Sequence, residues 1–214
     1  MIGVLGGTFD PIHFGHLRPA LELYEMLGLD ELRFVPSHVP PHRQSPVVPA
    51  AHRLAMVQRA IAGVSGFRVD PREIVRPGPS YTVDTLHDLR DEIGPAAPLV
   101  LIMGMDAFAG LPTWHRWRDI LALAHVVVAQ RPGDATRADA TWLGAASVVD
   151  SPRALRARAS GQVLFQAVTQ LDISATRIRA CLRAGRSARY LLPDDVCQYI
   201  TEHAFYHNAN EETE

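Results

Sequence analysis

The sequence contains no lysine, and all 21 of its basic residues are arginine. This absence excludes a phosphate-binding loop of the GxxxxGK[ST] type, whose lysine reaches the phosphates, and every enzyme that forms a Schiff base through lysine. Any phosphate that this protein binds must therefore be held by arginine, histidine, hydroxyl groups or backbone amides.

Cysteine, net charge and long apolar runs are also scarce. The two cysteines, Cys181 and Cys197, lie in patterns typical of helices, which argues against a disulfide framework and fits a reducing cytosol. A formal charge of −2 provides no basic surface for non-specific nucleic-acid binding. Apolar runs fall far short of the ~20 residues of a membrane helix, and the N-terminus does not resemble a signal peptide. We therefore expect a cytoplasmic protein without nucleic-acid or membrane partners; the oligomeric state stays open.

Short apolar runs alternate with helical patterns, which is typical of an α/β protein with a parallel sheet. Strands are expected over residues 2–5, 32–36, 67–70, 99–104 and 125–129, and weaker ones near 147–149 and 163–168. Helices are expected over residues 17–27, 51–62, 82–93, 114–124, 174–184 and 193–204. With 47% apolar residues and no repeat, the chain is predicted to form one domain with one core.

The segment GGTFDPIHFGH begins at Gly6, directly after the first expected strand. In open parallel sheets, ligands bind beyond the carboxyl ends of the strands. Gly6 and Gly7 would allow the backbone to approach a phosphate closely. His13 and His16 can lie on one face at the start of a helix, and Gly15 leaves space between them. Two imidazoles beside the positive end of a helix could donate hydrogen bonds to an oxygen that gains charge during phosphoryl-type transfer.

Other interpretations of these residues are available. A glycine pair after a strand is usually only a turn. The histidines could form half of a zinc site with His38 and His42, although structural zinc sites normally include cysteine. His203 and His207 could also hold a metal, but a solvent-facing pair is the more common arrangement. We expect no dedicated metal site in the chain.

Taken whole, the segment resembles the HxGH signature of a nucleotidyltransferase superfamily related to class I aminoacyl-tRNA synthetases. More narrowly, the chain resembles the nicotinate-nucleotide adenylyltransferases of bacterial NAD synthesis, with matching blocks over nearly its full length. The resemblance implies one nucleotidyltransferase domain over residues 1–214. This domain would be an α/β, Rossmann-like parallel sheet with helices on both faces (about 1–170) and a small C-terminal helical part (about 171–207).

The resemblance also implies a reaction. AMP would pass from ATP to nicotinate mononucleotide, giving deamido-NAD and pyrophosphate. Mg²⁺ would arrive with the ATP, because no cluster of carboxylates suggests a protein cage for it.

Several blocks are expected to bind ATP. A strand ends at Gly104 and Asp106, and a later helix starts with Ser174 and Thr176, where hydroxyls, amides and a guanidinium would form an anion site. The resemblance assigns catalysis to His13, His16 and Arg179. It assigns ATP binding to Gly6, Gly7, Thr8, Phe9, Gly104, Asp106, Arg131, Ser174 and Thr176.

A second set of residues is expected to bind nicotinate mononucleotide. Thr82 begins a helix, whose N-terminus suits a carboxylate, and Trp114 can stack on a flat pyridine ring. The resemblance assigns a backbone contact with the carboxylate to His115, and a contact with phosphate to His42.

The sequence also allows other functions. The acceptor could be nicotinamide mononucleotide or phosphopantetheine, and the nucleotide could be CTP. The chain could also be a non-catalytic nucleotide-binding regulator, although it keeps the family's catalytic side chains. A nicotinamide-dependent dehydrogenase is disfavoured, because the early glycines do not form GxGxxG.

Overall fold

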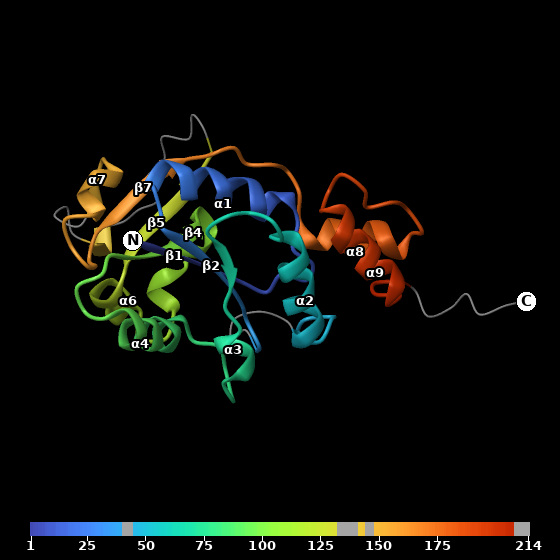
Figure 1. The fold of residues 1–214 in the computed structure, drawn as a ribbon, viewed down its shortest axis with the longest axis horizontal. Helices are drawn as coiled ribbons and strands as arrows, with labels where there is room; N and C mark the ends of the chain where they lie inside the picture. The colour runs from blue at the N-terminus through green and yellow to red at the C-terminus, as the bar shows by residue number, and fades with distance from the viewer. Residues whose placement is uncertain (40–44, 132–140, 144–147, 208–214) are drawn as a thin grey trace, which may run out of the picture.

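The computed structural model describes residues 1–39, 45–131, 141–143 and 148–207. These residues form one seven-stranded sheet, parallel throughout, in the order β3-β2-β1-β4-β5-β7-β6, between two layers of helices (Figure 1). The strands are β1 (Ile2–Gly7), β2 (Glu31–Pro36), β3 (Phe67–Val69), β4 (Leu99–Gly104), β5 (His125–Gln130), β6 (Val148–Val149) and β7 (Val163–Ala167). The expected α/β class and parallel sheet are confirmed.

The central strands are apolar on both sides, which explains why helices cover both faces. In β4, Val100 and Ile102 belong to one buried cluster, whereas Leu99 and Leu101 belong to the other. Because successive side chains of a strand point to opposite faces, a wholly apolar strand is stable only with both faces covered. The helices are α1 (Phe14–Leu27), α2 (Ala50–Ala60), α3 (Arg72–Val75), α4 (Thr82–Ile93), α5 (Met105–Ala109), α6 (Trp117–Leu123), α7 (Pro152–Leu155), α8 (Ala175–Arg183) and α9 (Asp194–Glu202), with 3-10 turns η1 (Leu111–Thr113) and η2 (Thr141–Leu143).

Strand β1 lies at the point where the strand order reverses. The chain continues from it to β2 and β3 on one side, and later to β4, β5, β7 and β6 on the other. Leu5 pairs with Phe34 in β2 and with Ile102 in β4, so the three strands end at the same edge. Ligands of open α/β sheets bind at such an edge.

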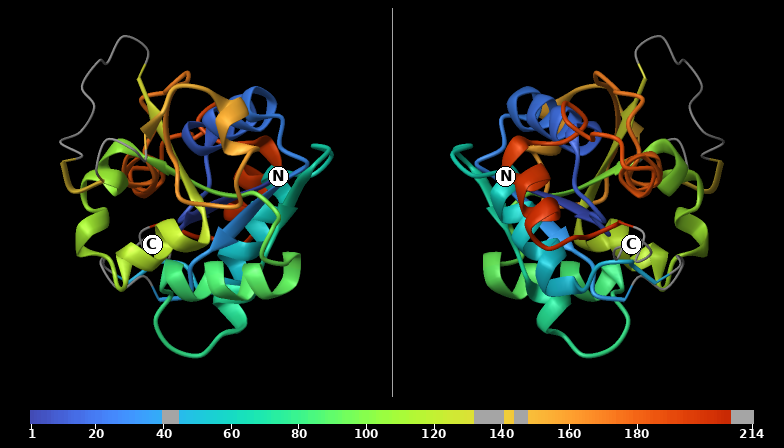
Figure 2. Two further views of the ribbon diagram at one scale, coloured as in Figure 1. Left: turned by 90° about the vertical axis from the view of Figure 1, so that its left-hand side faces the viewer. Right: turned by 90° about the vertical axis from the view of Figure 1, so that its right-hand side faces the viewer.

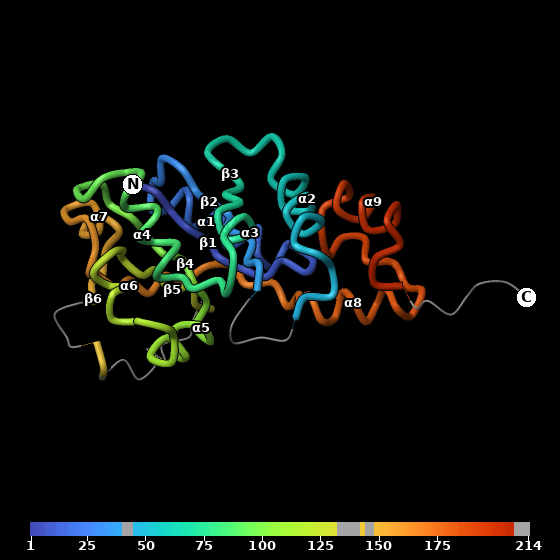
Figure 3. Tube along the Cα trace, turned by 90° about the horizontal axis from the view of Figure 1, so that it is seen from below, coloured from blue at the N-terminus to red at the C-terminus, as the bar shows by residue number. Residues whose placement is uncertain are grey.

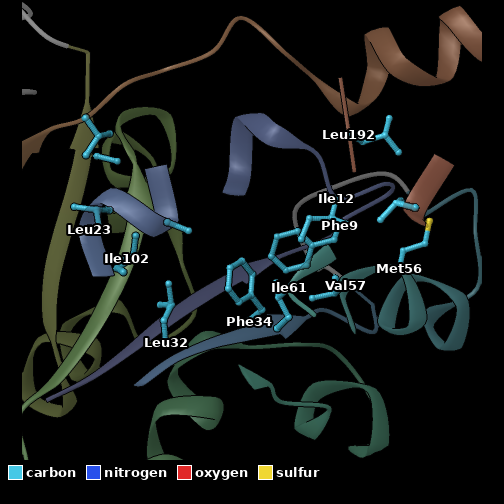
Figure 4. Close-up of a cluster of buried hydrophobic side chains, with 14 of the residues drawn as sticks. Phe9, Ile12, Leu23, Leu32, Phe34, Met56, Val57, Ile61, Ile102 and Leu192 are labelled. Carbon is cyan, nitrogen blue, oxygen red and sulfur yellow. The ribbon is translucent and has the colours of Figure 1, made fainter. Parts of the chain in front are cut away.

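Hydrophobic side chains determine the course of the loop between β1 and α1. Phe9 is 2% exposed and Ile12 is fully buried, and both lie near Phe34 and the α2 residues Met56 and Val57 (Figure 4). The loop therefore turns into the core before α1 begins.

The C-terminal helices α8 and α9 lie together at one end of the molecule (Figures 1 and 3). Viewed from that end, they stand in front of the sheet, and α9 contacts α2 (Figure 2). Ile178, Leu192 and Val196 join the same buried cluster as α1 and α2. The C-terminal part thus shares its core with the sheet. In the part of the chain that the structure describes, no helix is long and apolar enough to cross a membrane.

The expected elements are present, with differences at their ends. β1 continues to Gly7, and α1 begins at Phe14. The helix expected over residues 114–124 begins instead at Trp117, because Arg116 has a left-handed backbone (φ 50°). Trp114 and His115 consequently lie in the turn before α6.

Candidate active site

His13 and His16 lie side by side at the start of α1. Their ring centroids are 3.8 Å apart, with 30° between the ring planes. His13 is the N-cap residue of α1 and is 4% exposed. A Cβ on Gly15 would come within 2.9 Å of His13 Nδ1 and of the Ile173 carbonyl oxygen. Glycine at this position therefore allows the histidine pair to lie against the segment that precedes α8.

Burial makes His13 an uncharged imidazole at neutral pH. It lowers the pKa of His13 to about 4, because the charged form loses its hydration. A neutral imidazole keeps one N–H to donate and one nitrogen to accept. The buried Nδ1 has no hydrogen-bond partner among the described residues.

Arg179 reaches the same loop from α8. Its Nη1 donates to the carbonyl oxygen of Asp10 at 2.7 Å, and its Nη2 donates to Thr176 Oγ1 at 3.3 Å. The guanidinium is therefore bound to the loop three residues before His13. Arg179 Nε is buried and lacks a hydrogen-bond partner within the described part of the chain.

The Ser174 hydroxyl and the first amides of α1 already have partners. Ser174 caps α8, and its Oγ accepts from the N–H of Arg177 at 3.2 Å. The N–H of Phe14 donates to the Leu191 carbonyl at 3.1 Å, and the N–H of His16 donates to the His13 carbonyl at 2.8 Å. The N–H groups of Phe14 and His16 are therefore not free to bind an anion.

Glycines border open space at the edge where β1 and β4 end. A Cβ on Gly6 or on Gly104 would have no atom within 4 Å. A Cβ on Gly7 would come within 2.8 Å of the Phe9 ring. Asp106, in the first turn of α5, and Arg131, just after β5, are exposed at the same edge of the sheet. This arrangement brings five of the expected ATP-binding positions, Gly6, Gly7, Gly104, Asp106 and Arg131, to one edge.

Arg53 is a site residue that the sequence analysis missed. It is 1% exposed, and its guanidinium donates to the carbonyls of Thr8 at 2.6 Å, Val48 at 3.0 Å and His38 at 3.2 Å. It thus connects the ends of β1 and β2 with the segment before α2. A signal was available, because Arg53 lies on the same buried face of α2 as Met56, where an arginine requires partners.

Thr8 and Phe9 have different environments. The Thr8 carbonyl is bound to Arg53, and the Phe9 ring packs in the core, 5.3 Å from the His16 ring and 6.2 Å from the Phe34 ring. Because the ring is buried, only the backbone of Phe9 can contact ATP.

The residues expected to bind the acceptor come together at the starts of α4 and α6. The His115 ring lies 4.4 Å from the ring of Tyr81, which precedes Thr82, and Trp114 is partly buried against the core beneath these helices. His42 lies outside the described residues, so its expected role stays a prediction.

Residues 37 and 38 link the two halves of the site, which are the end of β1, where ATP is expected to bind, and the start of α4, where the acceptor is expected to bind. The N–H of Ser37 donates to the Gly7 carbonyl at 2.9 Å, and the N–H of His38 donates to Ser80 Oγ at 2.9 Å. Ser37 Oγ and His38 Nδ1 are buried without hydrogen-bond partners in the described chain. Unpartnered polar atoms thus occur in both halves of the site, where a polar ligand would satisfy them.

Comparison with known proteins identifies the family of the chain. The cytidylyltransferase-like family model matches residues 4–181. A curated protein of Pseudomonas syringae pv. tomato, named "Probable nicotinate-nucleotide adenylyltransferase", is 53% identical over 211 residues and is aligned over 98% of this chain and 95% of its own length. A protein of the same name from Halorhodospira halophila is 53% identical over 208 residues, covering 96% of this chain and 94% of its own.

A solved structure has the same fold at lower identity. The Plasmodium falciparum nicotinic acid mononucleotide adenylyltransferase complexed with NaAD matches with a TM-score of 0.71 and 15% identity, over 96% of both chains. At this identity the match shows the shared fold alone.

Proposed function

The chain belongs to the nicotinate-nucleotide adenylyltransferases, within the cytidylyltransferase-like family, and on that premise we propose that it transfers AMP from ATP to nicotinate mononucleotide. Deamido-NAD and pyrophosphate are the products, and the reaction takes place in the cytoplasm, where ATP is available. One observation carries the proposal: the Arg179 guanidinium is bound to the loop that leads into the His13–His16 pair.

In this mechanism, a phosphate oxygen of nicotinate mononucleotide attacks the α-phosphorus of ATP in line, and the bond to pyrophosphate breaks. The attacking oxygen is already anionic, so alignment and charge stabilisation matter more than a strong base. His13 and His16 donate hydrogen bonds to the α-phosphate as its charge develops. Arg179, with the backbone amides of Ser174–Thr176, holds the pyrophosphate.

Thr82, Trp114 and His115 bind the nicotinate end of the acceptor in this proposal. Trp114 stacks on the pyridine ring, and the backbone around Thr82 and His115 receives the carboxylate. His42 contacts phosphate. The proximity of His115 to Tyr81 supports placing these residues in one subsite.

Magnesium enters as part of the substrate, bound to the phosphates of ATP and to water. Among the described residues, no group of three His, Cys, Asp or Glu side chains could hold a metal ion. Asp10 accepts hydrogen bonds on both carboxylate oxygens, from Tyr206 and from the backbone of Val47. The arginine and histidine side chains at the site suit a metal-bound triphosphate rather than a bare cation.

Pyrophosphate release tests the function directly. ATP or CTP is offered with nicotinate mononucleotide, nicotinamide mononucleotide or phosphopantetheine, with and without Mg²⁺. We expect the highest kcat/KM for ATP with nicotinate mononucleotide, because donors left unpaired by an uncharged amide reject the nicotinamide analogue. Absence of pyrophosphate with this pair would refute the function, and equal kcat/KM for the two mononucleotides would refute the carboxylate subsite.

The same assay tests the histidine pair. His16→Ala is expected to lower kcat by about 10²–10³-fold, the loss typical of one transition-state donor. His87→Ala, which alters an exposed histidine of α4, serves as the control and should retain wild-type kcat. Near-normal turnover of His16→Ala would remove His16 from catalysis.

A further inference from the structure

We propose that Tyr206, which follows the last helix, is a positioning residue of the active site and acts through Asp10. The inference rests on the proposed function, since positioning is measured as turnover. Neither residue is among those that the sequence assigned to catalysis or binding.

The Tyr206 side chain is held at the loop between β1 and α1. It is 5% exposed, and its hydroxyl donates to Asp10 Oδ1 at 2.5 Å. Its backbone is left-handed (φ 67°), a conformation that is uncommon for a bulky residue and that surrounding contacts must maintain. Burial, together with the Asp10 carboxylate, raises the pKa of the Tyr206 phenol, so the hydroxyl remains a donor.

Asp10 connects four segments of the chain. Its carboxylate is 5% exposed and accepts from Tyr206 on Oδ1 and from the Val47 N–H on Oδ2 at 2.7 Å. Its backbone carbonyl accepts from Arg179. The N-terminal loop, the segment before α2, helix α8 and the chain after α9 therefore meet at one residue.

The loss of the phenol oxygen would disturb Asp10 more than it would disturb the core. A buried carboxylate requires hydrogen bonds, and Oδ1 would lose the donor that Tyr206 supplies. Asp10 would then move toward other donors and shift the carbonyl that holds Arg179, together with His13 three residues later. A ring without the hydroxyl would still fill the same space. The hydroxyl thus serves the geometry of the site, whereas the ring serves packing.

Tyr199 offers a matched control in the same part of the chain. It is 8% exposed, and its hydroxyl lies 2.8 Å from His52 Nδ1, in the contact between α9 and α2. Tyr199→Phe and Tyr206→Phe each remove one hydroxyl from a nearly buried ring. Only Tyr206 is bonded to the loop that carries the histidines.

Kinetics and thermal unfolding of the full-length variants test the proposal at temperatures well below each melting point. Tyr206→Phe is expected to lower kcat about ten-fold, the size of a lost hydrogen bond to a charged group, with less than a two-fold change in the KM of ATP. Tyr199→Phe should keep kcat within two-fold of wild type, whatever its melting temperature. A wild-type kcat in Tyr206→Phe would overturn the proposal, as would a variant unfolded at the assay temperature, since the role would then be structural.

A double-mutant cycle tests the route through Asp10. If Tyr206 acts through that carboxylate, Tyr206→Phe should lower kcat no further in an Asp10→Asn background. If the two substitutions instead lower kcat by independent factors that multiply, Tyr206 does not act through Asp10. If the wild-type chain itself releases no pyrophosphate, the proposed function is wrong. That result is distinct from a change of kcat in the variants, which tests the role of Tyr206.

Discussion

His13 shows how burial determines the charge of a residue in the site. An exposed histidine titrates near pH 6.5, but His13 is 4% exposed and has a pKa lowered to about 4. Its imidazole therefore donates as a neutral group over the whole physiological range. The donor does not depend on pH in that range, which suits the stabilisation of a phosphate rather than proton transfer.

This depressed pKa predicts a loss of stability in acid. Between pH 6.5 and about 4, the unfolded chain binds a proton at residue 13 that the folded chain does not, so the free energy of unfolding rises with pH in that window. The contribution is complete above pH 6.5, and about 3 kcal/mol is lost by pH 4. Denaturant titrations of wild type and His13→Gln at several pH values measure it.

The comparison isolates His13 from other histidines. Burial also lowers the pKa of His125, but that residue is present in both chains and contributes equally. The variant should show the smaller pH dependence. Identical slopes would contradict a neutral, buried His13.

Two glycines of the site should respond to alanine in opposite ways. Gly15→Ala places a methyl group against His13 Nδ1 and the Ile173 carbonyl, so we expect about 1–3 kcal/mol of destabilisation and a lower kcat. Gly6→Ala meets no protein atom, so stability should change by less than about 0.5 kcal/mol, while the KM of ATP rises because the methyl group occupies the phosphate path. Denaturant unfolding measures the stability of both variants, and steady-state kinetics measure their kcat and their KM for ATP. A fully stable Gly15→Ala, or a Gly6→Ala with normal KM, would contradict the assignment.

At the scale of elements, helix α2 holds the loops of the site. Its apolar face packs on the sheet, and the same face carries Arg53, whose three hydrogen bonds satisfy carbonyls of the loops that follow β1 and β2. A buried guanidinium is stable there because main-chain oxygens replace its water. The helix thereby joins core packing to site geometry.

Arg53→Met should destabilise the fold by about 2–4 kcal/mol, because three carbonyls lose their donors while an unbranched apolar stem is kept. Arg59→Met, on the same helix but exposed, removes a guanidinium that lies 4.1 Å from the centre of the Tyr199 ring, and should cost about 0.5–1 kcal/mol. Urea unfolding of both variants provides the measurement. Equal losses would show that the buried hydrogen bonds of Arg53 add nothing specific.

The start of α6 illustrates a limit of sequence patterns at element ends. Hydrophobic spacing extends back to Trp114, but the left-handed Arg116 separates that residue from the helix. The backbone of a turn depends on the packing around it, which periodicity does not report. The consequence is functional, since Trp114 and His115 lie in a turn beside Tyr81.

At the scale of the whole molecule, the C-terminal part shares a buried core with the sheet, and we expect the two parts to unfold as one cooperative unit. Its buried residues join the cluster that underlies α1, and its Arg179 and Tyr206 complete the N-terminal loop. We expect a chain ending at residue 170 to aggregate or to unfold without a cooperative transition, because the apolar surface under α8 and α9 becomes exposed. A chain ending at His207 is the control. Cooperative unfolding of the shorter chain, measured by circular dichroism, would instead make the C-terminal part an independent appendage.

The sequence by itself determined the order of the strands and of the longer helices, the class of fold and the N-terminal phosphate-binding candidate, because apolar periodicity and glycine placement act over short stretches of chain. The short helices α3, α5 and α7 were not predicted, since four or five residues are too few to show a period. Only the tertiary structure decided that Arg179 binds the Asp10 carbonyl, that Tyr206 binds the Asp10 carboxylate, that Arg53 is buried and that His13 is uncharged. Each of these depends on which distant segments pack together and exclude water. Burial and long-range hydrogen bonds of this kind leave no regular spacing in the sequence.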